Sequence, residues 1–128
     1  MKIEVSIGEV VDKITILQIK KEKINEKNKL RYIDEELQIL VNTLKSEGAR
    51  VPQEMIDELR KINENLWDAE DVLRDKENSK EFDREYIENA RLDAKLNDQR
   101  FLAKNKINTH CNSLIREQKS YEGLYTAD

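Results

Sequence analysis

Asn97–Asn108, with the sequence NDQRFLAKNKIN, lies inside the longest helix that the sequence predicts. At about 100° per residue, the polar residues Asn97, Arg100, Lys104 and Asn108 fall on one helical face. Apolar residues before and after them share that face, so the polar side chains interrupt a stripe that would otherwise be buried. Because burying an unpaired charge costs several kcal/mol, the stretch predicts either a buried polar network or the wall of a cleft.

The composition predicts an all-helical protein. Of the 128 residues, 39% are charged and 38% hydrophobic, with three Gly and one Pro. A β-rich domain would need more turn residues and more β-branched or aromatic runs. We expect a single helical domain over residues 1–128, an antiparallel, coiled-coil-like bundle of three to four long helices. The net charge of −4 argues against nucleic acid as a partner, because phosphate binding needs a basic field.

The N-terminal region predicts a short extended arm and then a helix. Met1–Ser6 alternates apolar and polar residues, and a capping-box pattern places the start of the helix at Ile7. Ile16 and Ile19 lie opposite the main apolar stripe, so this helix has two apolar faces. Such a helix is central in the bundle, or it packs on the bundle with one face and on a second subunit with the other.

The rest of the chain predicts three more helices. The apolar stripe loses phase at Asn25–Asn28, where we expect a turn. The second helix ends near Gly48, which suits a left-handed position, and Pro52 fits the first position of a third helix. A capping-box-like pattern starts the fourth helix at Asn78, and no breaker follows it until about Lys119.

Helix length leads to the expectation of a homodimer. At a rise of 1.5 Å per residue, the fourth helix would be roughly 60 Å long and would extend beyond the third. The overhang needs the first helix or a second chain to cover it. The dimer would therefore form at this overhang or through the first-helix face that carries Ile16 and Ile19, and long helices also suit another protein partner.

No cysteine or histidine motif in the chain indicates a metal site. Cys111 is the one cysteine and His110 the one histidine, which excludes a zinc site of the usual ligands. Cys111 cannot form an internal disulfide, and Met1–Gly8 lacks the apolar core of a secretory signal. No apolar run approaches the length of a transmembrane helix. We expect a cytoplasmic protein with no cofactor and no membrane insertion.

Several segments carry a family resemblance, in order along the chain. The opening is Val5–Glu9 (VSIGE) with Val11–Leu17 (VDKITIL), and the centre is Leu66–Asp71 (LWDAED). Residues 97–108 then contain ND, R, K and IN, and KSY follows at 119–121. These segments resemble a family of small bacterial proteins known only as a domain of unknown function. The resemblance implies a mostly helical protein associated with glycosyltransferases and surface-polysaccharide genes, and it implies no catalytic residue.

The polar face of the fourth helix provides the candidate binding site. If the third and fourth helices are antiparallel neighbours, Glu70 would neutralise Arg100 or Lys104 in a polar cleft between them. A ligand site of this kind would hold a phosphate or carboxylate with Arg and Lys. The alternative is a buried ion pair that fixes helix register. The candidate ligand-binding residues are Trp67, Glu70, Asp71, Arg91, Asn97, Arg100, Lys104 and Asn108.

Two classes of function agree with these features. The first is a binding or accessory module that acts through helix–helix interaction and the polar cleft. The second is a small enzyme or ligand-binding protein for a phosphorylated or carboxylated molecule. In that class, Glu35 and Glu36 with Glu54 and Asp57 are similar to the Mg²⁺ site of the all-α nucleotide pyrophosphohydrolases. The sequence leaves enzyme status and catalytic residues open.

Overall fold

The computed structural model describes residues 1–113, and these form four α-helices and no strand. The helices are α1 (Ile7–Lys23), α2 (Lys27–Ser46), α3 (Gln53–Ser79) and α4 (Arg84–His110). The all-helical fold that the composition predicted is therefore confirmed. Residues 1–6 contain neither helix nor strand, and the extended arm stays a prediction.

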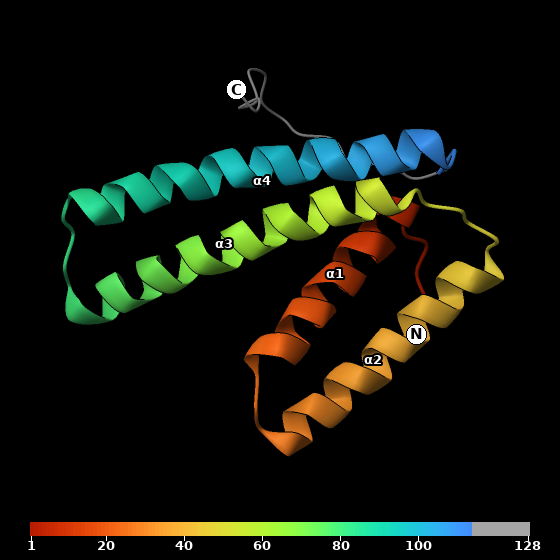
Figure 1. Cartoon of the computed structure of the whole chain (residues 1–128), viewed down its shortest axis with the longest axis horizontal. Helices are drawn as coiled ribbons and strands as arrows, with labels where there is room; N and C mark the ends of the chain where they lie inside the picture. The colour runs from red at the N-terminus through yellow and green to blue at the C-terminus, as the bar shows by residue number, and fades with distance from the viewer. Residues whose placement is uncertain (114–128) are drawn as a thin grey trace.

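The four helices form two hairpins that cross at an angle (Figure 1). α3 and α4 run antiparallel along each other, as predicted, and the α1–α2 hairpin meets them near the start of α3 and the end of α4. α1 packs on α2, α3 and α4, whereas α2 packs on α1 alone among the described helices. The first helix is therefore central, and the other end of the α3–α4 hairpin projects beyond it.

Local signals explain most of the helix ends. The Ser6 hydroxyl accepts a hydrogen bond from the Glu9 amide at 3.0 Å, which confirms the predicted start of α1. Residues 24–26 separate α1 from α2, so the predicted turn is confirmed. Gly48 follows α2 with a φ of +67°, the left-handed conformation expected of it. Pro52 is the N-cap of α3, one position before the predicted one.

The predicted boundary between the third and fourth helices was wrong. Asn78 lies inside α3, which ends where Lys80 takes a left-handed φ of 55°. The N-cap of α4 is Asp83, whose carboxylate accepts the Tyr86 amide at 3.0 Å. Asp is favoured as the N-cap of α4 by this hydrogen bond, and its negative charge is favoured by the positive end of the helix dipole.

The predicted length of the fourth helix was also wrong. α4 ends at His110, and Asn112 takes a left-handed φ of 54° rather than continuing the helix to Lys119. α3 and α4 have 27 residues each, so the overhang that suggested a second chain does not exist within residues 1–113. The predicted KSY feature at 119–121 lies outside the described residues.

The main core lies where α1 crosses α3 and α4. Its buried residues are Val11, Leu59, Ile62, Leu66, Leu96, Ala103 and Ile107. Ile19, which the sequence placed on a second apolar face, is 1% exposed within this one chain, and Ile16 is half-buried. Ile19 is thus covered within the chain, and the dimer through the Ile16 and Ile19 face stays a prediction. Among residues 1–113, no helix combines the length and apolar character needed to cross a membrane.

Candidate functional site

The polar face of α4 packs against α1 and is neutralised there. Arg100 donates from Nε to Asp12 Oδ1 at 2.9 Å and from a terminal nitrogen to Asp12 Oδ2 at 2.5 Å. Asp12 is 0% exposed, and the same Oδ1 also accepts from Asn63 Nδ2 at 2.9 Å. Asn63 further donates to Thr15 Oγ1 at 2.9 Å. The buried carboxylate therefore has its charge paired and both oxygens hydrogen-bonded, as burial requires.

Two more contacts follow along α4 toward its C-terminal end. Lys104 forms an ion pair with Glu9 at 2.8 Å. Asn108 Oδ1 accepts the Gly8 amide at 2.6 Å. A Cβ on residue 8 would lie 2.5 Å from the Lys104 carbonyl oxygen, so only Gly permits this approach of α1 to α4. Two successive turns of α4 thus each make one contact with the first turn of α1.

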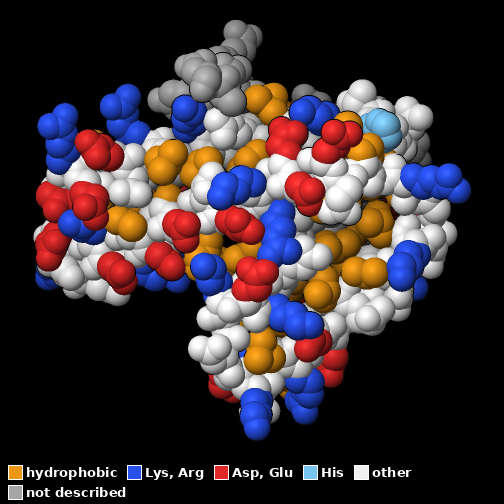
Figure 2. All heavy atoms as spheres, in the orientation of Figure 1, with side chains coloured by type: hydrophobic (Ala, Val, Ile, Leu, Met, Phe, Trp, Pro, Cys, Tyr) orange, Lys and Arg blue, Asp and Glu red, His pale blue; other side chains and the backbone are white. Residues whose placement is uncertain are grey.

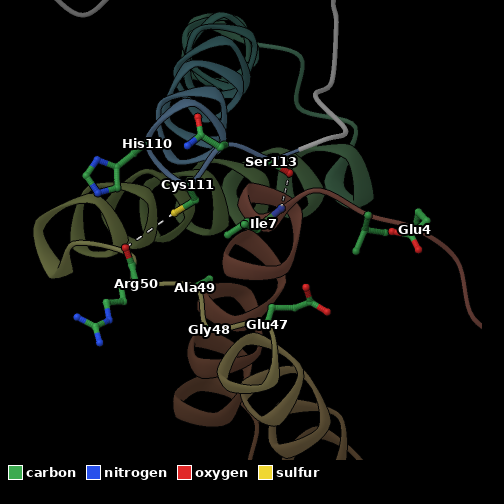
Figure 3. A pocket seen from close by; sticks show the side chains of 11 residues that line it. Glu4, Ile7, Glu47, Gly48, Ala49, Arg50, His110, Cys111 and Ser113 are labelled. Carbon is green, nitrogen blue, oxygen red and sulfur yellow. Dashed lines mark hydrogen bonds between the residues drawn. The ribbon is translucent and has the colours of Figure 1, made fainter.

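The end of α4 also caps α1 from outside the helix (Figure 3). Ser113 Oγ accepts the Ile7 amide at 3.1 Å, and the Cys111 thiol points toward the Arg50 carbonyl oxygen at 3.9 Å. These residues border a cavity of ≈ 510 Å³ between the start of α1, the α2–α3 connection and the end of α4. Burial raises the pKa of the Cys111 thiol, which keeps it in the protonated, weakly nucleophilic form.

Asp12 is the acid that hydrogen-bonds Arg100, whereas Glu70 acts on Arg100 only through its charge. Asp12 and Glu9 of α1 pair with Arg100 and Lys104, so the polar cluster lies between α1 and α4 with a contribution from α3. It does not line a cleft between α3 and α4. A helical period indicates which residues share a face, but it does not say which neighbouring helix covers that face.

Glu70 instead lies beside Asp93 of α4. Desolvation raises the pKa of the Glu70 carboxyl, and hydrogen bonding to Asp93 together with the Asp93 charge raises it further, while Arg100 and Arg74 oppose the shift. Asp93 Oδ1 is buried, and no donor among the described residues reaches it unless Glu70 carries a proton. The Asp93 charge thus favours a proton on Glu70.

The remaining predicted binding residues do not join the α1–α4 contact. Asn97 donates to the Asp93 carbonyl at 3.0 Å, within α4 itself. Trp67 is half-buried on α3. Asp71 and Arg91 are exposed, and neither has an ion pair within residues 1–113. Of the eight candidates, the structure brings Arg100, Lys104 and Asn108 together through their partners on α1.

The partners on α1 and α3 were not among the predicted site residues: Gly8, Glu9, Asp12, Thr15 and Asn63. One signal was present. Asp12 and Thr15 interrupt the apolar part of the first helix much as Arg100 and Lys104 interrupt the fourth. A buried acid on one helix indicates that it pairs with a buried base on another helix, because burying either charge without a partner is costly.

A small polar cavity adjoins the Asp12–Arg100 pair. It holds ≈ 230 Å³ where α1, α2 and α4 meet. Its wall consists of charged residues around two apolar ones: Glu9, Asp12, Lys13, Ile16, Leu17, Lys20, Glu36 and Arg100.

A more apolar groove of ≈ 330 Å³ lies in the angle between α2 and α3, and α1 forms its floor. Val11 and Ile14 come from α1, Val41 and Leu44 from α2, and Ile56 from α3. Figure 2 shows hydrophobic side chains gathered in this angle, with charged side chains of both signs spread over the neighbouring surface. The groove exists because the backbones of α2 and α3 stay apart.

The acids that resembled a Mg²⁺ site do not converge. Glu35 and Glu36 lie on α2, and Glu54 and Asp57 lie on α3, two helices whose backbones do not pack together. Within residues 1–113, no group of three or more Cys, His, Asp or Glu side chains is placed to hold a metal ion. The structure therefore gives the pyrophosphohydrolase interpretation no support.

Comparison with known proteins agrees with the resemblance in the sequence. No curated protein and no solved structure matches the chain. One family model matches residues 1–127, nearly the whole length. The motifs VSIGE, LWD and ND–R–K–IN all lie within this match, as does the α1–α4 contact. The chain therefore belongs to the Family of unknown function (DUF6165).

Proposed function

We propose that the protein is a helix–helix interaction module that forms a homodimer through the groove between α2 and α3. The observation that carries this proposal is the position of α2, which has α1 as its one neighbour among the described helices. A helix in a four-helix bundle ordinarily packs on two neighbours. In α2 only Ile33 is buried, while Leu37, Leu40, Val41 and Leu44 are half-buried. The apolar stripe of α2 is thus incompletely covered.

The groove has the chemistry of a helix-binding site. Its floor and walls are aliphatic, and polar side chains such as Gln18 and Gln53 border it. An amphipathic helix binds such a groove by inserting residues spaced three and four apart. Arg60 stiffens one rim, because its guanidinium is bonded to Glu22, Gln18 and Glu64.

A second copy of the chain is the occupant that the charges favour. Lys45 lies on the α2 rim and Asp57 on the α3 rim, and neither forms an ion pair within residues 1–113. A two-fold interface is self-complementary, so every contact between two different residues occurs a second time with the two copies exchanged. If α2 enters the groove of the second copy, Lys45 of each copy faces Asp57 of the partner subunit, so the dimer contains this contact two times. The half-covered α2 stripe supplies the apolar face that each groove receives.

Two matched substitutions on α2 test the proposal. Val41 lines the groove, whereas Ile39 lies on the opposite face of the helix and is 65% exposed. Sedimentation velocity over a range of concentrations should show a dimer for the wild type and for Ile39→Asp. Val41→Asp should weaken the dimer by at least about tenfold, because a carboxylate would be desolvated in an apolar groove. Circular dichroism of both variants checks that the monomers remain helical.

Other outcomes would contradict the proposal. A wild type that is monomeric at every concentration would do so, and so would a folded Val41→Asp variant that dimerises as tightly as Ile39→Asp. If Val41→Asp does not fold, Lys45→Glu replaces it, because this exposed residue contributes little to the monomer. A monomeric wild type would leave the groove to a helix of another protein, such as the glycosyltransferases that the family resemblance implies.

A further inference from the structure

The small cavity between α1, α2 and α4 contains charges that the helix packing does not use. Two acids on its wall are already paired. Asp12 pairs with Arg100, which also lines the cavity, and Glu9 pairs with Lys104, which does not. Lys13 and Lys20 also line it, and neither forms an ion pair within residues 1–113.

Glu36 is the one remaining acid on that wall, and it too has no ion pair among the described residues. Two cations therefore face one anion after the paired groups are set aside. The wall itself carries three acids and three bases, and one positive charge is in excess once Lys104, which pairs with Glu9 from outside the wall, is counted. An excess of this sign attracts an anionic ligand.

We propose that this cavity binds a small phosphate monoester, with Lys13 and Lys20 contacting the phosphate and Glu36 accepting a hydroxyl of the ligand. The two lysines are seven residues apart on α1, so they share a helical face about 10.5 Å apart along the axis. Their flexible side chains can converge on a single group between them. Lysine binds phosphate as a point charge, whereas Arg100 is already oriented by Asp12.

The apolar residues and the size of the cavity limit the rest of the ligand. Ile16 and Leu17 lie between the two lysines in the sequence and line the same cavity, where they can contact carbon atoms. A volume of ≈ 230 Å³ is below the roughly 300–1,000 Å³ typical of sites for drug-sized molecules. The site therefore suits a compact phosphate ester with hydroxyl groups.

The test is a titration of the ¹⁵N-labelled full chain with glycerol 3-phosphate, followed by amide chemical shifts. Potassium chloride and acetate at the same ionic strength separate site binding from charge screening. Saturable shifts within residues 13–20 are expected for glycerol 3-phosphate alone. Lys13→Met and Lys20→Met should each weaken binding at least tenfold, while Lys23→Met, which removes an α1 lysine outside the cavity, should not.

Glu36→Gln gives a second, independent measurement. It removes the one unpaired acid, so inorganic phosphate should bind the variant more tightly than it binds the wild type. Equal shifts with chloride or acetate would overturn the proposal, as would Lys13→Met and Lys20→Met variants that bind like Lys23→Met. An absence of saturable shifts in the wild type would also overturn it. The dimer is measured separately, so either proposal can fail without the other.

Discussion

At the scale of single residues, Asp12 is the group on which the α1–α4 contact depends. Its carboxylate is fully buried and accepts from Arg100 and Asn63. Removing one member of a buried ion pair is far more costly than the net stability of the pair, because the other charge stays desolvated. The partial exposure of Arg100, at 30%, lets water compensate in part and places the cost at the lower end of the usual range.

A double-mutant cycle measures this coupling. We expect Asp12→Ala to lower the free energy of unfolding by about 3 kcal/mol. The double variant Asp12→Ala with Arg100→Met should lose at least about 1 kcal/mol less than the sum of the single variants, since it leaves no unpaired guanidinium. Urea denaturation followed by circular dichroism gives all four values. Additive losses would show that the pair does not act as a unit.

Glu70 and Asp93 make stability depend on pH in the unusual direction for a carboxylate. The folded-state pKa of Glu70 is raised, so the folded protein holds this proton more tightly than the unfolded chain does. At pH values below the ordinary glutamate pKa of about 4.3, the proton on Glu70 contributes its whole stabilisation of the folded state. It is lost as the pH rises from there through the raised pKa.

Glu70→Gln should remove that dependence. The amide can donate to Asp93 Oδ1 at any pH, so the variant should gain stability relative to the wild type at pH 7 and lose the advantage near pH 4. Free energies of unfolding at the two pH values test this. The expectation fails if the difference between variant and wild type is the same at both. Asp71→Asn is the control, because Asp71 follows Glu70 on the same helix and, like Glu70, is exposed, whereas the hydrogen bond to Asp93 is made by Glu70.

At the scale of elements, the crossing of α1 over α4 depends on Gly8. Alanine is about 1 kcal/mol better than glycine inside a helix, so Gly8→Ala would stabilise α1 considered alone. The close approach to the Lys104 carbonyl reverses the sign, because a Cβ there requires the helices to separate. We expect a net loss of about 1–3 kcal/mol in chemical denaturation.

Gly48→Ala provides the comparison. An added Cβ at residue 48 meets no atom within 4 Å, and the φ of +67° leaves only backbone strain, about 1–2 kcal/mol. Gly8→Ala should also abolish the protection of the residue 8 amide from hydrogen exchange, because that amide loses its bond to Asn108, whereas Gly48→Ala should leave the amide protected. A stabilised Gly8→Ala variant would show that α1 and α4 are not packed as described.

Local sequence signals predicted the elements they belong to. Ser6 and Gly48 mark their helix ends by their own hydrogen bonding or backbone preference, and both were correct. Asn78 was misleading because Asn and Asp cap helices about equally well, and Asp83 has the additional support of an ion pair with Lys76 at 2.8 Å. The end of α4 was missed because Asn112 is only mildly favoured in the left-handed conformation.

The candidate site was predicted in part for a related reason. Periodicity identified Arg100, Lys104 and Asn108 as buried polar residues, and the structure places them in a polar contact. It could not identify α1 as their partner, since Asp12 lies 88 residues before Arg100. Contacts between distant elements depend on how hairpins cross, and no local pattern specifies that angle.

At the scale of the whole molecule, the two hairpins share one core and leave α2 with a single neighbour. The crossing angle that brings Asp12 to Arg100 also separates α2 from α3 (Figure 1). The groove is therefore a consequence of the same contact that holds the hairpins together. Composition could not reveal it, because the apolar stripe of α2 looks the same whether one or two neighbours cover it.

The most direct test of this account exchanges charges across the proposed dimer. Lys45→Glu and Asp57→Lys should each weaken self-association, because every rim contact then joins like charges. Mixing the two variants gives a heterodimer in which Glu at 45 faces Lys at 57, and Lys at 45 faces Asp at 57. The dissociation constant of the mixture, measured by sedimentation velocity, should be about tenfold tighter than that of either variant alone. A mixture that associates no more tightly than its components would contradict the account.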